Sequence, residues 1–443
     1  MVGTRSSALS AAPRDDNRMI VIVTGANSGF GLGICHQLLS NLSLPPGTPL
    51  PASTPQRSAL PPSKQNLCDT DPGPSKHVPT SPPPTLTLIL ACRSKSKAEE
   101  AIEIVSKRHE KELQARADAG MPTREGWKDG LRIVWEPVDL DAVGGPLGVL
   151  SFCERVKQNY PHITTMFLNA GMAVHRKNHY FQMTYQVLTQ GLCRPLTYGT
   201  FTDENPGVMS ADGERGMVWG VNVLAPYILS KELAPLLRQS PDTLPFPPRI
   251  IYTSSCTAEY SSLKPNPLED YQLLSYGYPD NSSVYKASKY CGDLVMIQLD
   301  RQFAKAASEG EREIRVFTAD PGVVATNIAG STFGPWVFYR KFMQFMNFLI
   351  FFLVRLAGSP FHPVYATEGA LPMLYAALIG SEYVQPADKV PAQKFRVHAT
   401  RWGSTTVDYG EVDQWESTLD LGRDMTRACE AVRLTYRRSE GLE

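Results

Sequence analysis

The chain has 443 residues, of which 42% are hydrophobic and 20% are charged. These proportions are typical of a globular protein with a sizeable core, and they exclude a fibrous or wholly disordered chain. Its 44 basic residues balance its 44 acidic residues. Because no positive excess is present, we expect no nucleic-acid partner.

The eight cysteines show no metal-ligand spacing, so we expect reduced thiols and no metal site. Residues 1–18 are polar, and we expect them to form a disordered N-terminus without a signal peptide. No uninterrupted apolar run reaches the length of about 18 residues that a conventional membrane-spanning helix needs.

From residue 19 onward, apolar segments of strand length alternate with longer segments of helical composition. The predicted strands are 19–24, 86–91, 131–135, 165–168, 249–253 and 314–318. The predicted helices are 34–40, 95–117, 148–158, 222–239 and 284–306. Such alternation is typical of α/β proteins. We therefore predict a Rossmann-type doubly wound parallel sheet in a single domain, 19–443, that carries insertions.

One insertion is recognisable by its composition alone. Residues 44–84 contain 13 prolines, mixed with serine, threonine and glycine. Proline lacks a backbone N–H group and blocks helix formation, and the segment offers little apolar surface to bury. We therefore predict a disordered, Pro-rich excursion on the surface of the domain.

A glycine-rich turn follows the first predicted strand. The residues from Thr24 to Gly31 read TGANSGFG, which gives the spacing GxxxGxG. Glycines let a backbone approach a pyrophosphate closely, and the N-terminus of the following helix favours negative charge. Its position between a strand and a helix makes a dinucleotide site a better interpretation than a plain turn.

Tyr285 and Lys289 open the last predicted helix and lie four residues apart, so they share one helix face. A neighbouring lysine stabilises a phenolate, which would suit the tyrosine for proton transfer. Taken alone, the pair is equally compatible with a chance pair on a solvated face. Ser254 and Ser255 end the fifth strand, where parallel sheets place ligand contacts, although an ordinary polar strand end explains them as well.

Together these features resemble the short-chain dehydrogenase/reductase family. The chain contains, in the order of that family, TGxxxGxG, Asp139, Asn169-Ala170-Gly171, Asn222, Ser255, YxxxK and Pro321-Gly322. The resemblance extends from about residue 19 to residue 381. Within the family, the chain is most similar to the 3-keto-steroid reductases of sterol biosynthesis. Three local features carry that similarity: an insertion at 172–215, which would lie on the substrate side, the stretch 268–271, and the sequence YKASKY at 285–290.

The resemblance implies a role for each matching residue. Tyr285 would be the general acid, Lys289 would lower its pKa and bind the nicotinamide ribose, and Asn222 would support a water relay. Ser255 would hold the substrate carbonyl, or Ser254 if the strand end is offset by one residue. The implied cofactor-binding residues are Gly25, Asn27, Ser28, Gly29, Phe30, Gly31, Asp139, Leu140, Asn169, Tyr285, Lys289, Val324 and Thr326.

The cofactor expected is NADPH. The second strand ends in Ala91-Cys92-Arg93, with no acidic residue at its tip. A carboxylate there would bind the ribose hydroxyls of NAD and repel a 2′-phosphate, whereas Arg93 offers a permanently charged fork for that phosphate. An exposed arginine at the start of a helix is the alternative interpretation.

The resemblance implies an NADPH-dependent reductase of the C3 ketone of a sterol during C-4 demethylation. The alternatives are another lipid-directed reductase, acting on a 17-keto steroid or a retinoid, and a scaffold for sterol enzymes on a membrane. The expected partners are the sterol, a membrane surface and other C-4 demethylation enzymes, whereas the sequence does not predict an oligomeric state. The expected location is the cytosolic face of the endoplasmic reticulum, or lipid droplets.

A helix at 336–356 is expected to associate with a membrane. Phe338, Phe342, Phe345, Leu349 and Phe352 recur at intervals of three and four residues, which places them on one face. The charge-free part of the segment is 13 residues long, or about 20 Å, which is shorter than a hydrocarbon core of about 30 Å. We therefore predict a helix that lies in the membrane surface with Arg340, Lys341 and Arg355 among headgroups. A lid helix buried against protein remains the alternative.

Overall fold

The computed structural model describes residues 18–45, 48, 54–65, 85–244, 246–280, 282–325, 337–387 and 392–442. Its centre is an eight-stranded sheet in the order β10-β9-β8-β7-β4-β1-β2-β3. The strands are β1 Arg18–Thr24, β2 Thr85–Cys92, β3 Arg132–Pro137, β4 Thr165–Leu168, β7 Arg249–Thr253, β8 Arg315–Asp320, β9 Gln393–Ala399 and β10 Thr405–Glu411. All neighbouring strands pair in parallel except β10, which runs antiparallel to β9.

All six predicted strands are present, with ends shifted by up to two residues. β1 begins at Arg18, so this residue belongs to the sheet rather than to the N-terminal segment predicted to be disordered. β9 and β10 were not predicted. The result is the predicted Rossmann-type doubly wound sheet, extended at one edge by an antiparallel strand.

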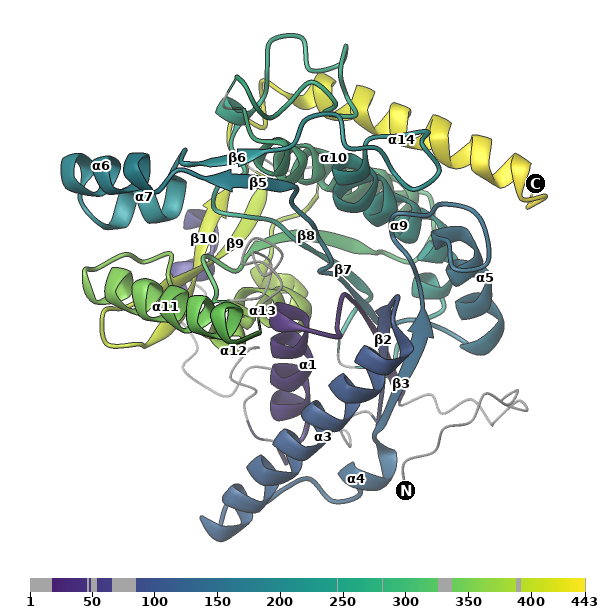
Figure 1. Cartoon of the computed structure of the whole chain (residues 1–443). Helices are drawn as coiled ribbons and strands as arrows, with labels where there is room; N and C mark the ends of the chain where they lie inside the picture. Colours follow the sequence, from purple (N-terminus) through teal and green to yellow (C-terminus); the bar gives the residue numbers. More distant parts are fainter. Residues whose placement is uncertain are drawn as a thin grey trace.

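Helices cover both faces of the sheet (Figure 1). One layer contains α1 Gly29–Leu42, α3 Lys95–Asp118 and α13 Leu371–Leu378, and the other contains α5 Val149–Asn159, α9 Ala225–Arg238 and α10 Val284–Ser308. α14 Leu419–Ser439 packs outside α10 and α9. The remaining helices are α4 Trp127–Gly130, α6 Tyr180–Gln190, α7 Cys193–Tyr198, α8 Met217–Trp219, α11 Val337–Leu356 and α12 Ala366–Gly369.

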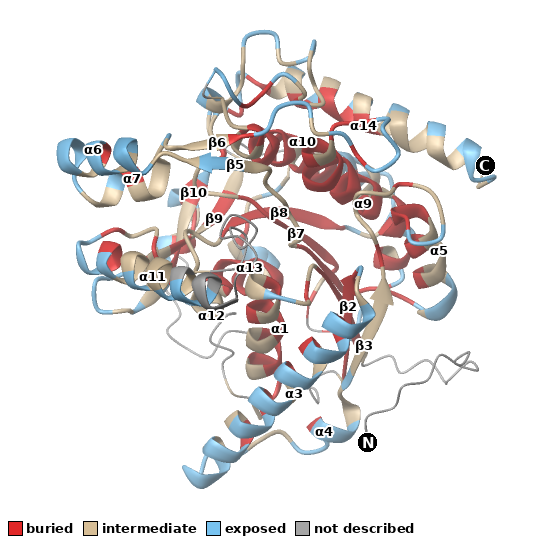
Figure 2. Ribbon diagram, in the orientation of Figure 1, coloured by how far each residue is buried: buried red, intermediate tan, exposed pale blue. Residues whose placement is uncertain are grey.

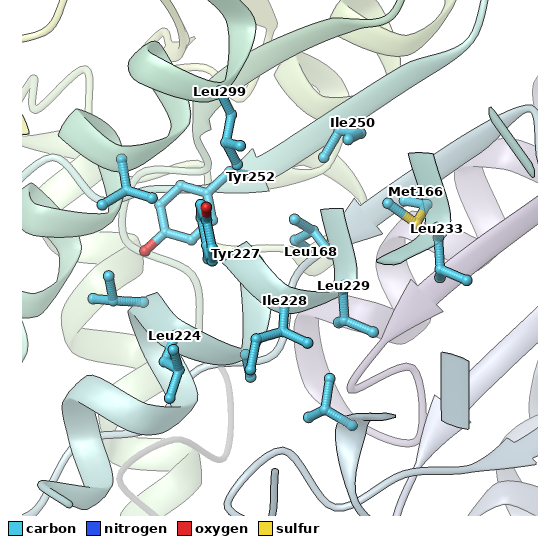
Figure 3. Close-up of a cluster of buried hydrophobic side chains, with 14 of the residues drawn as sticks. Met166, Leu168, Leu224, Tyr227, Ile228, Leu229, Leu233, Ile250, Tyr252 and Leu299 are labelled. Carbon is cyan, nitrogen blue, oxygen red and sulfur yellow. The ribbon is translucent and has the colours of Figure 1, made fainter. Parts of the chain in front are cut away.

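The period of two along each strand divides the core into these two layers. In β1, Ile20 and Ile22 belong to the cluster on the α9 side, whereas Val21 and Val23 belong to the cluster on the α1 side. Figure 2 shows the strands and the inner faces of the covering helices buried together. Figure 3 shows how leucine, isoleucine and tyrosine side chains of α9 and α10 meet those of β4 and β7. This packing fixes the frame that holds the carboxyl ends of the strands.

The two insertions differ in structure. The segment 172–215 forms a small sheet, β5 His175–Asn178 paired with β6 Thr202–Glu204, together with α6 and α7. Of the Pro-rich segment 44–84, residues 54–65 are described, and they form short 3-10 turns at Arg57–Ala59 and Pro62–Lys64.

Residues 54–65 are packed on the domain, which corrects the prediction of a disordered excursion for this part. Ala59 and Leu60 are buried. The Ser58 hydroxyl donates to Val407 O at 2.6 Å, and the Val407 N–H donates to Gln56 Oε1 at 2.8 Å. Val407 lies in β10, the edge strand of the sheet. Residues 54–65 therefore cover the edge of β10, although their composition does not differ from that of the rest of the Pro-rich segment.

Candidate active site

The parallel strands bring the predicted motifs to one edge of the sheet. β1, β4, β7 and β8 all point their carboxyl ends in one direction, and each is followed directly by a predicted motif. β1 lies between β2 and β4, so the chain winds in opposite directions on its two sides. Ligands of α/β sheets bind in the crevice at such a reversal.

The glycine-rich turn after β1 has the shape that a pyrophosphate needs. Gly25 has a φ angle of +65°, which favours glycine. A Cβ atom on Gly31 would lie 2.4 Å from Gly25 O, so no side chain fits there. α1 begins at Gly29, and Ser28 makes no capping hydrogen bond within the described part of the chain. The first N–H groups of α1 therefore remain available to an anion, and the turn, including Asn27, fits a dinucleotide phosphate.

Asn169 holds this turn from the end of β4. Its side-chain amide donates to Thr24 O at 2.9 Å, and its backbone N–H donates to Thr24 Oγ1 at 2.9 Å. A Cβ atom on Gly31 would also lie 2.9 Å from Asn169 Nδ2. Asn169, predicted to bind the cofactor, thus lies beside the turn that would bind the phosphates.

Phe30 and Val324 converge although nearly 300 residues separate them. A Cβ atom on Gly369, the last residue of α12, would lie 2.6 Å from Val324 Cγ2 and 3.3 Å from Phe30 Cε2. Glycine at this position lets the segment after β8 approach the start of α1. Val324 is therefore beside the glycine-rich turn, as a nicotinamide-bordering residue would be, whereas Thr326 lies outside the described residues.

Arg93 and Asp139 follow the neighbouring strands β2 and β3. Arg93 Nη1 lies 3.4 Å from Asp139 Oδ2, and the side chain of Arg93 is 73% exposed. Asp139 Oδ1 accepts the backbone N–H of Asp141 at 3.2 Å, which holds the turn containing Leu140. These two predicted cofactor-binding residues thus contact each other, and the Arg93 side chain is largely exposed beside Asp139.

Ser255 and Tyr285 lie close together at this edge of the sheet. The Ser255 hydroxyl is close enough to the half-buried phenol of Tyr285 to lower its pKa, although burial and the nearby Cys256 outweigh this and leave the pKa of Tyr285 above its usual value. Ser254 points the other way, and its hydroxyl donates to Asp293 Oδ2 at 2.7 Å. Of the two serines, Ser255 is the one that faces Tyr285.

Lys289 lies one turn after Tyr285 and is buried. Its Nζ donates to Thr253 O at 2.8 Å and is 5.9 Å from the centroid of the Tyr285 ring. Burial lowers the pKa of Lys289 to about 8, opposed by Asp293 and assisted by Lys394. Burial and the nearby Cys256 dominate the pKa of Tyr285 in this arrangement, in which the ammonium group of Lys289 donates to the Thr253 carbonyl.

Asn222 joins this group from a π-helical turn, Gly220–Leu224, that precedes α9. Its Oδ1 accepts the N–H of Met172 at 2.9 Å, and its Nδ2 donates to Met172 O and to Ser288 Oγ. Its own carbonyl accepts the Tyr252 hydroxyl at 3.0 Å. A Cβ atom on Gly171 would lie 3.1 Å from Lys289 Nζ and 3.3 Å from Asn222 Oδ1. A side chain at position 171 would therefore crowd both Lys289 and Asn222, and glycine lets the backbone pass close to the two residues.

Sequence reasoning missed Glu204, which ends β6 in the insertion. Its carboxylate accepts the Tyr285 N–H at 2.9 Å and the Ser283 hydroxyl at 2.7 Å. It is 6% exposed. A carboxylate at a helix N-terminus satisfies free N–H groups and suits the positive end of the helix dipole. No local spacing announces this contact, because the partners are 81 residues apart in sequence.

α11 packs beside α7 and leaves an apolar stripe exposed. The stripe consists of Phe342, Phe345, Leu349, Leu353 and Leu356. Phe352, which was predicted to belong to it, is only half exposed and lies under the guanidinium group of Arg355. Arg355 is buried and pairs with Glu368 at 3.3 Å, so the prediction that it sits among lipid headgroups is wrong. Among the residues that the structure describes, no helix is long and apolar enough to cross a membrane.

No family model matches the chain. Among curated proteins, it is 24% identical to the 3-keto-steroid reductase erg27 of Aspergillus fumigatus over 431 residues, which cover 90% of this chain and 82% of that protein. It is 23% identical to the human 3-keto-steroid reductase/17-beta-hydroxysteroid dehydrogenase 7 over 403 residues, which cover 91% of both chains.

A solved structure, the L-sorbose reductase of Gluconobacter frateurii, is similar with a TM-score of 0.45 and 15% identity, covering 88% of this chain and 99% of that one. This likeness is too weak to carry an argument. The curated relatives span nearly the whole chain, and they include the group that the motifs predicted. The chain is thus similar to 3-keto-steroid reductases over about 90% of its length.

Proposed function

We propose that the chain is an NADPH-dependent 3-keto-steroid reductase that reduces the C3 ketone of a sterol intermediate during C-4 demethylation. The observation that carries this proposal is the meeting of Ser255, Tyr285 and Lys289 beside a glycine-rich turn shaped for a dinucleotide. Curated relatives with this activity in their names match about 90% of the chain, which supports the substrate class.

The chain's own groups would bind and protonate the substrate, and the nicotinamide cofactor supplies the hydride. The Ser255 hydroxyl would donate to the C3 carbonyl oxygen. Tyr285 would then give its phenol proton to the alkoxide that develops there. Because burial raises the pKa of Tyr285, the phenol stays protonated at neutral pH, which suits a general acid in the direction of reduction.

Lys289 and Asn222 would complete the proton path. Lys289 has a pKa of about 8, so most of it carries a charge at neutral pH. Once the tyrosine has lost its proton, the ammonium group would stabilise the phenolate. The Asn222 amide holds the backbone at Met172, next to the approach between Lys289 and Gly171. A water at this place would connect Lys289 to solvent.

The first experiment tests the reaction and its substrate. Purified protein is incubated with NADPH and a panel of a 4-methyl 3-keto sterol, a 17-keto steroid and retinal, and nicotinamide absorbance is followed. We expect turnover with the 3-keto sterol and a loss of about 10²- to 10⁴-fold in Tyr285→Phe. Tyr290→Phe is the matched control, because it removes a hydroxyl of the same helix that bonds Asp413 O away from the site. Turnover with the 17-keto steroid or retinal alone would favour the alternative lipid substrates.

The cofactor preference has its own test. Arg93 is exposed at the tip of β2, where it can form a charged pair with a 2′-phosphate. We expect Arg93→Ala to weaken NADPH binding and to leave NADH binding nearly unchanged. An unaltered ratio of the two affinities in this variant would contradict the assignment.

We also propose that the protein works at the cytosolic face of the endoplasmic reticulum membrane or on lipid droplets, in contact with other C-4 demethylation enzymes. The exposed apolar stripe of α11 supports a membrane surface as the partner, because its residues recur on one helix face. The exposed Lys341 directly precedes Phe342, the first residue of the stripe. A sterol in the membrane would then reach the site without crossing water.

A further inference from the structure

A buried ion pair lies directly behind the candidate catalytic residues. Lys394 of β9 and Asp293 of α10 are 2.9 Å apart, and their side chains are 2% and 0% exposed. The second carboxylate oxygen of Asp293 has no hydrogen-bond partner among the described residues. Such a pair is weak support for stability, because apolar residues of similar volume often serve as well. The position of this ion pair beside the candidate catalytic residues indicates a role other than stability.

Lys394 and Asp293 both bind the end of β7, next to the candidate catalytic Ser255. Lys394 Nζ donates to Ser255 O at 3.0 Å, and Asp293 Oδ2 accepts the Ser254 hydroxyl at 2.7 Å. Lys289 Nζ holds the preceding carbonyl, that of Thr253, at 2.8 Å. Three consecutive residues at the end of β7, 253–255, are thus each tied to one of three charged side chains. These contacts fix the backbone that carries the Ser255 hydroxyl, and the hydroxyl itself lies 2.9 Å from Thr257 Oγ1.

We propose that Asp293 and Lys394 are positioning residues, which hold Ser255 toward Tyr285 and set the charge around Lys289 by opposing each other. Asp293 lies one helical turn after Lys289 on the same face of α10. The inference deepens the proposed reductase function and rests on it for the role of Ser255. Its electrostatic part concerns Lys289 itself, whatever the substrate.

The two charges act on Lys289 in opposite directions. Asp293 favours the charged amine, whereas Lys394 disfavours it, and burial adds to the effect of Lys394. The other titratable groups around Lys289 and Tyr285 are Tyr252 of β7, Cys256, Asp320 of β8 and Glu204 of β6. Burial raises the pKa of Tyr252, Cys256 and Asp320, and the ion pair acts on them as well: Asp293 raises the pKa of Tyr252 and Asp320, whereas Lys394 lowers that of Cys256 and Asp320. Removing one partner leaves the charge of the other uncompensated beside Lys289.

α10 provides a matched control seven residues further on. Asp300 pairs with Arg315 of β8 through two contacts of 3.1 Å, and its carboxylate also accepts the Val316 N–H. This pair is also buried and ties the same helix to the sheet. It lies at the start of β8, however, at the opposite end of that strand from the site. Asp300→Asn should cost stability without changing Lys289.

The experiment measures the pKa of Lys289 directly and without substrate. Protein with ¹³C-labelled lysine is titrated by NMR, and Lys289→Met assigns the signal. We expect a pKa near 8 in the parent chain, a rise of about one pH unit or more in Lys394→Met and a similar fall in Asp293→Asn. The double variant Asp293→Asn/Lys394→Met should return toward the parent value, and Asp300→Asn should stay at it.

The activity readout tests the positioning part. With the 3-keto sterol and NADPH, both single variants should lose about tenfold or more in kcat with little change in the affinity for NADPH, and the basic limb of the pH profile should move as the Lys289 pKa does. Shifts in the same direction, no shift, or an equal shift in Asp300→Asn would overturn the inference. If a single variant does not fold, the double variant and Ser254→Ala decide: Ser254→Ala must lower kcat and leave the Lys289 pKa unchanged. An inactive parent chain would refute the proposed function, while the NMR titration would still test the ion pair.

Discussion

The segments 172–215 and 54–65 both interrupt the alternation of strands and helices, but they contact different parts of the domain. The first carries Glu204 to the N-terminus of α10, directly at Tyr285. The second carries Gln56 and Ser58 to the edge strand β10. A short contact at a helix end can thus bear on chemistry, whereas a similar contact at a sheet edge bears on the integrity of the fold. The comparison teaches that length and composition of an insertion do not indicate which of the two it does.

The largest effect is expected from replacing Glu204, which lies in the segment 172–215. In Glu204→Ala the N–H of Tyr285 loses a charged acceptor, and such a hydrogen bond is worth about 1.5–3 kcal/mol. We expect kcat to fall by about 10- to 100-fold, and Glu204→Gln to recover part of it. The measurement is steady-state turnover of the 3-keto sterol. Asp203→Asn is the control, because Asp203 precedes Glu204 but pairs with His179 at 2.8 Å, away from α10. Equal losses in the two variants would mean that the insertion as a whole was disturbed.

The next effect concerns α11, which borders the same insertion through α7. Cys193 of α7 lies 3.8 Å from Val354 O of α11. Burying each large apolar side chain is worth about 1.5–3 kcal/mol, so Phe345→Ser/Leu349→Ser should reduce partition onto phospholipid vesicles by about tenfold or more. Flotation of the protein with vesicles measures this. Tyr365→Phe is the control, because it keeps the ring that packs on Phe348 of α11. Phe351→Ser would not serve, because the Phe351 ring packs on His362. Unchanged flotation of the serine variant would remove α11 as the anchor.

A smaller effect is expected where residues 54–65 meet β10. Gln56→Ala/Ser58→Ala removes two hydrogen bonds to Val407, each worth about 1 kcal/mol. For a chain of this size we expect a loss of about 2 °C in Tm and unchanged turnover. Thermal unfolding and the steroid assay are measured on the same preparation. A fall in turnover without a fall in Tm would show that this contact communicates with the site.

The smallest effect is expected from a deletion within the same Pro-rich segment. Removing residues 66–84 and joining Gln65 to Thr85 with a short glycine-serine linker spares every contact of 54–65 with the domain. Because closure entropy changes slowly with loop length, Tm and turnover should stay within error. The extended deletion 54–84 should reproduce the Tm loss of the Gln56/Ser58 variant. A large loss from the short deletion would indicate packing by residues 66–84.

The frame of the fold was predictable because β1, β2, β4 and β7 are mostly apolar, as is typical of strands buried on both faces. β9 and β10 were missed for the opposite reason. Five of the seven residues of β10 are at least partly exposed, and polar side chains such as Thr405, Thr406 and Asp408 obscure its strand character. The polar α14 was missed as well, although Met425 and Cys429 on one face are buried.

The candidate site divides in the same way. Tyr285, Lys289 and the glycine-rich turn were predictable because their spacing is local and follows from one helix or one turn. The choice of Ser255 over Ser254 was not, because it depends on Asp293, which takes the Ser254 hydroxyl from the opposite direction. Glu204 and Lys394 were not predictable either. Each reaches the site from a separate strand, and the sequence around a single charged residue does not indicate which distant residue it contacts.

The π-helical turn at Gly220–Leu224 has a consequence for how this chain tolerates change. A π turn holds an extra residue within an otherwise α-helical segment. From within this turn the Asn222 carbonyl accepts the Tyr252 hydroxyl, and the Asn222 side chain bonds Met172 and Ser288. Deleting one residue between Trp219 and Ala225 would remove the extra residue and move Asn222 away from these partners. The direction of the Asn222 side chain is therefore set by the number of residues in the turn, so a single-residue deletion here should disturb the site even when Asn222 itself is kept.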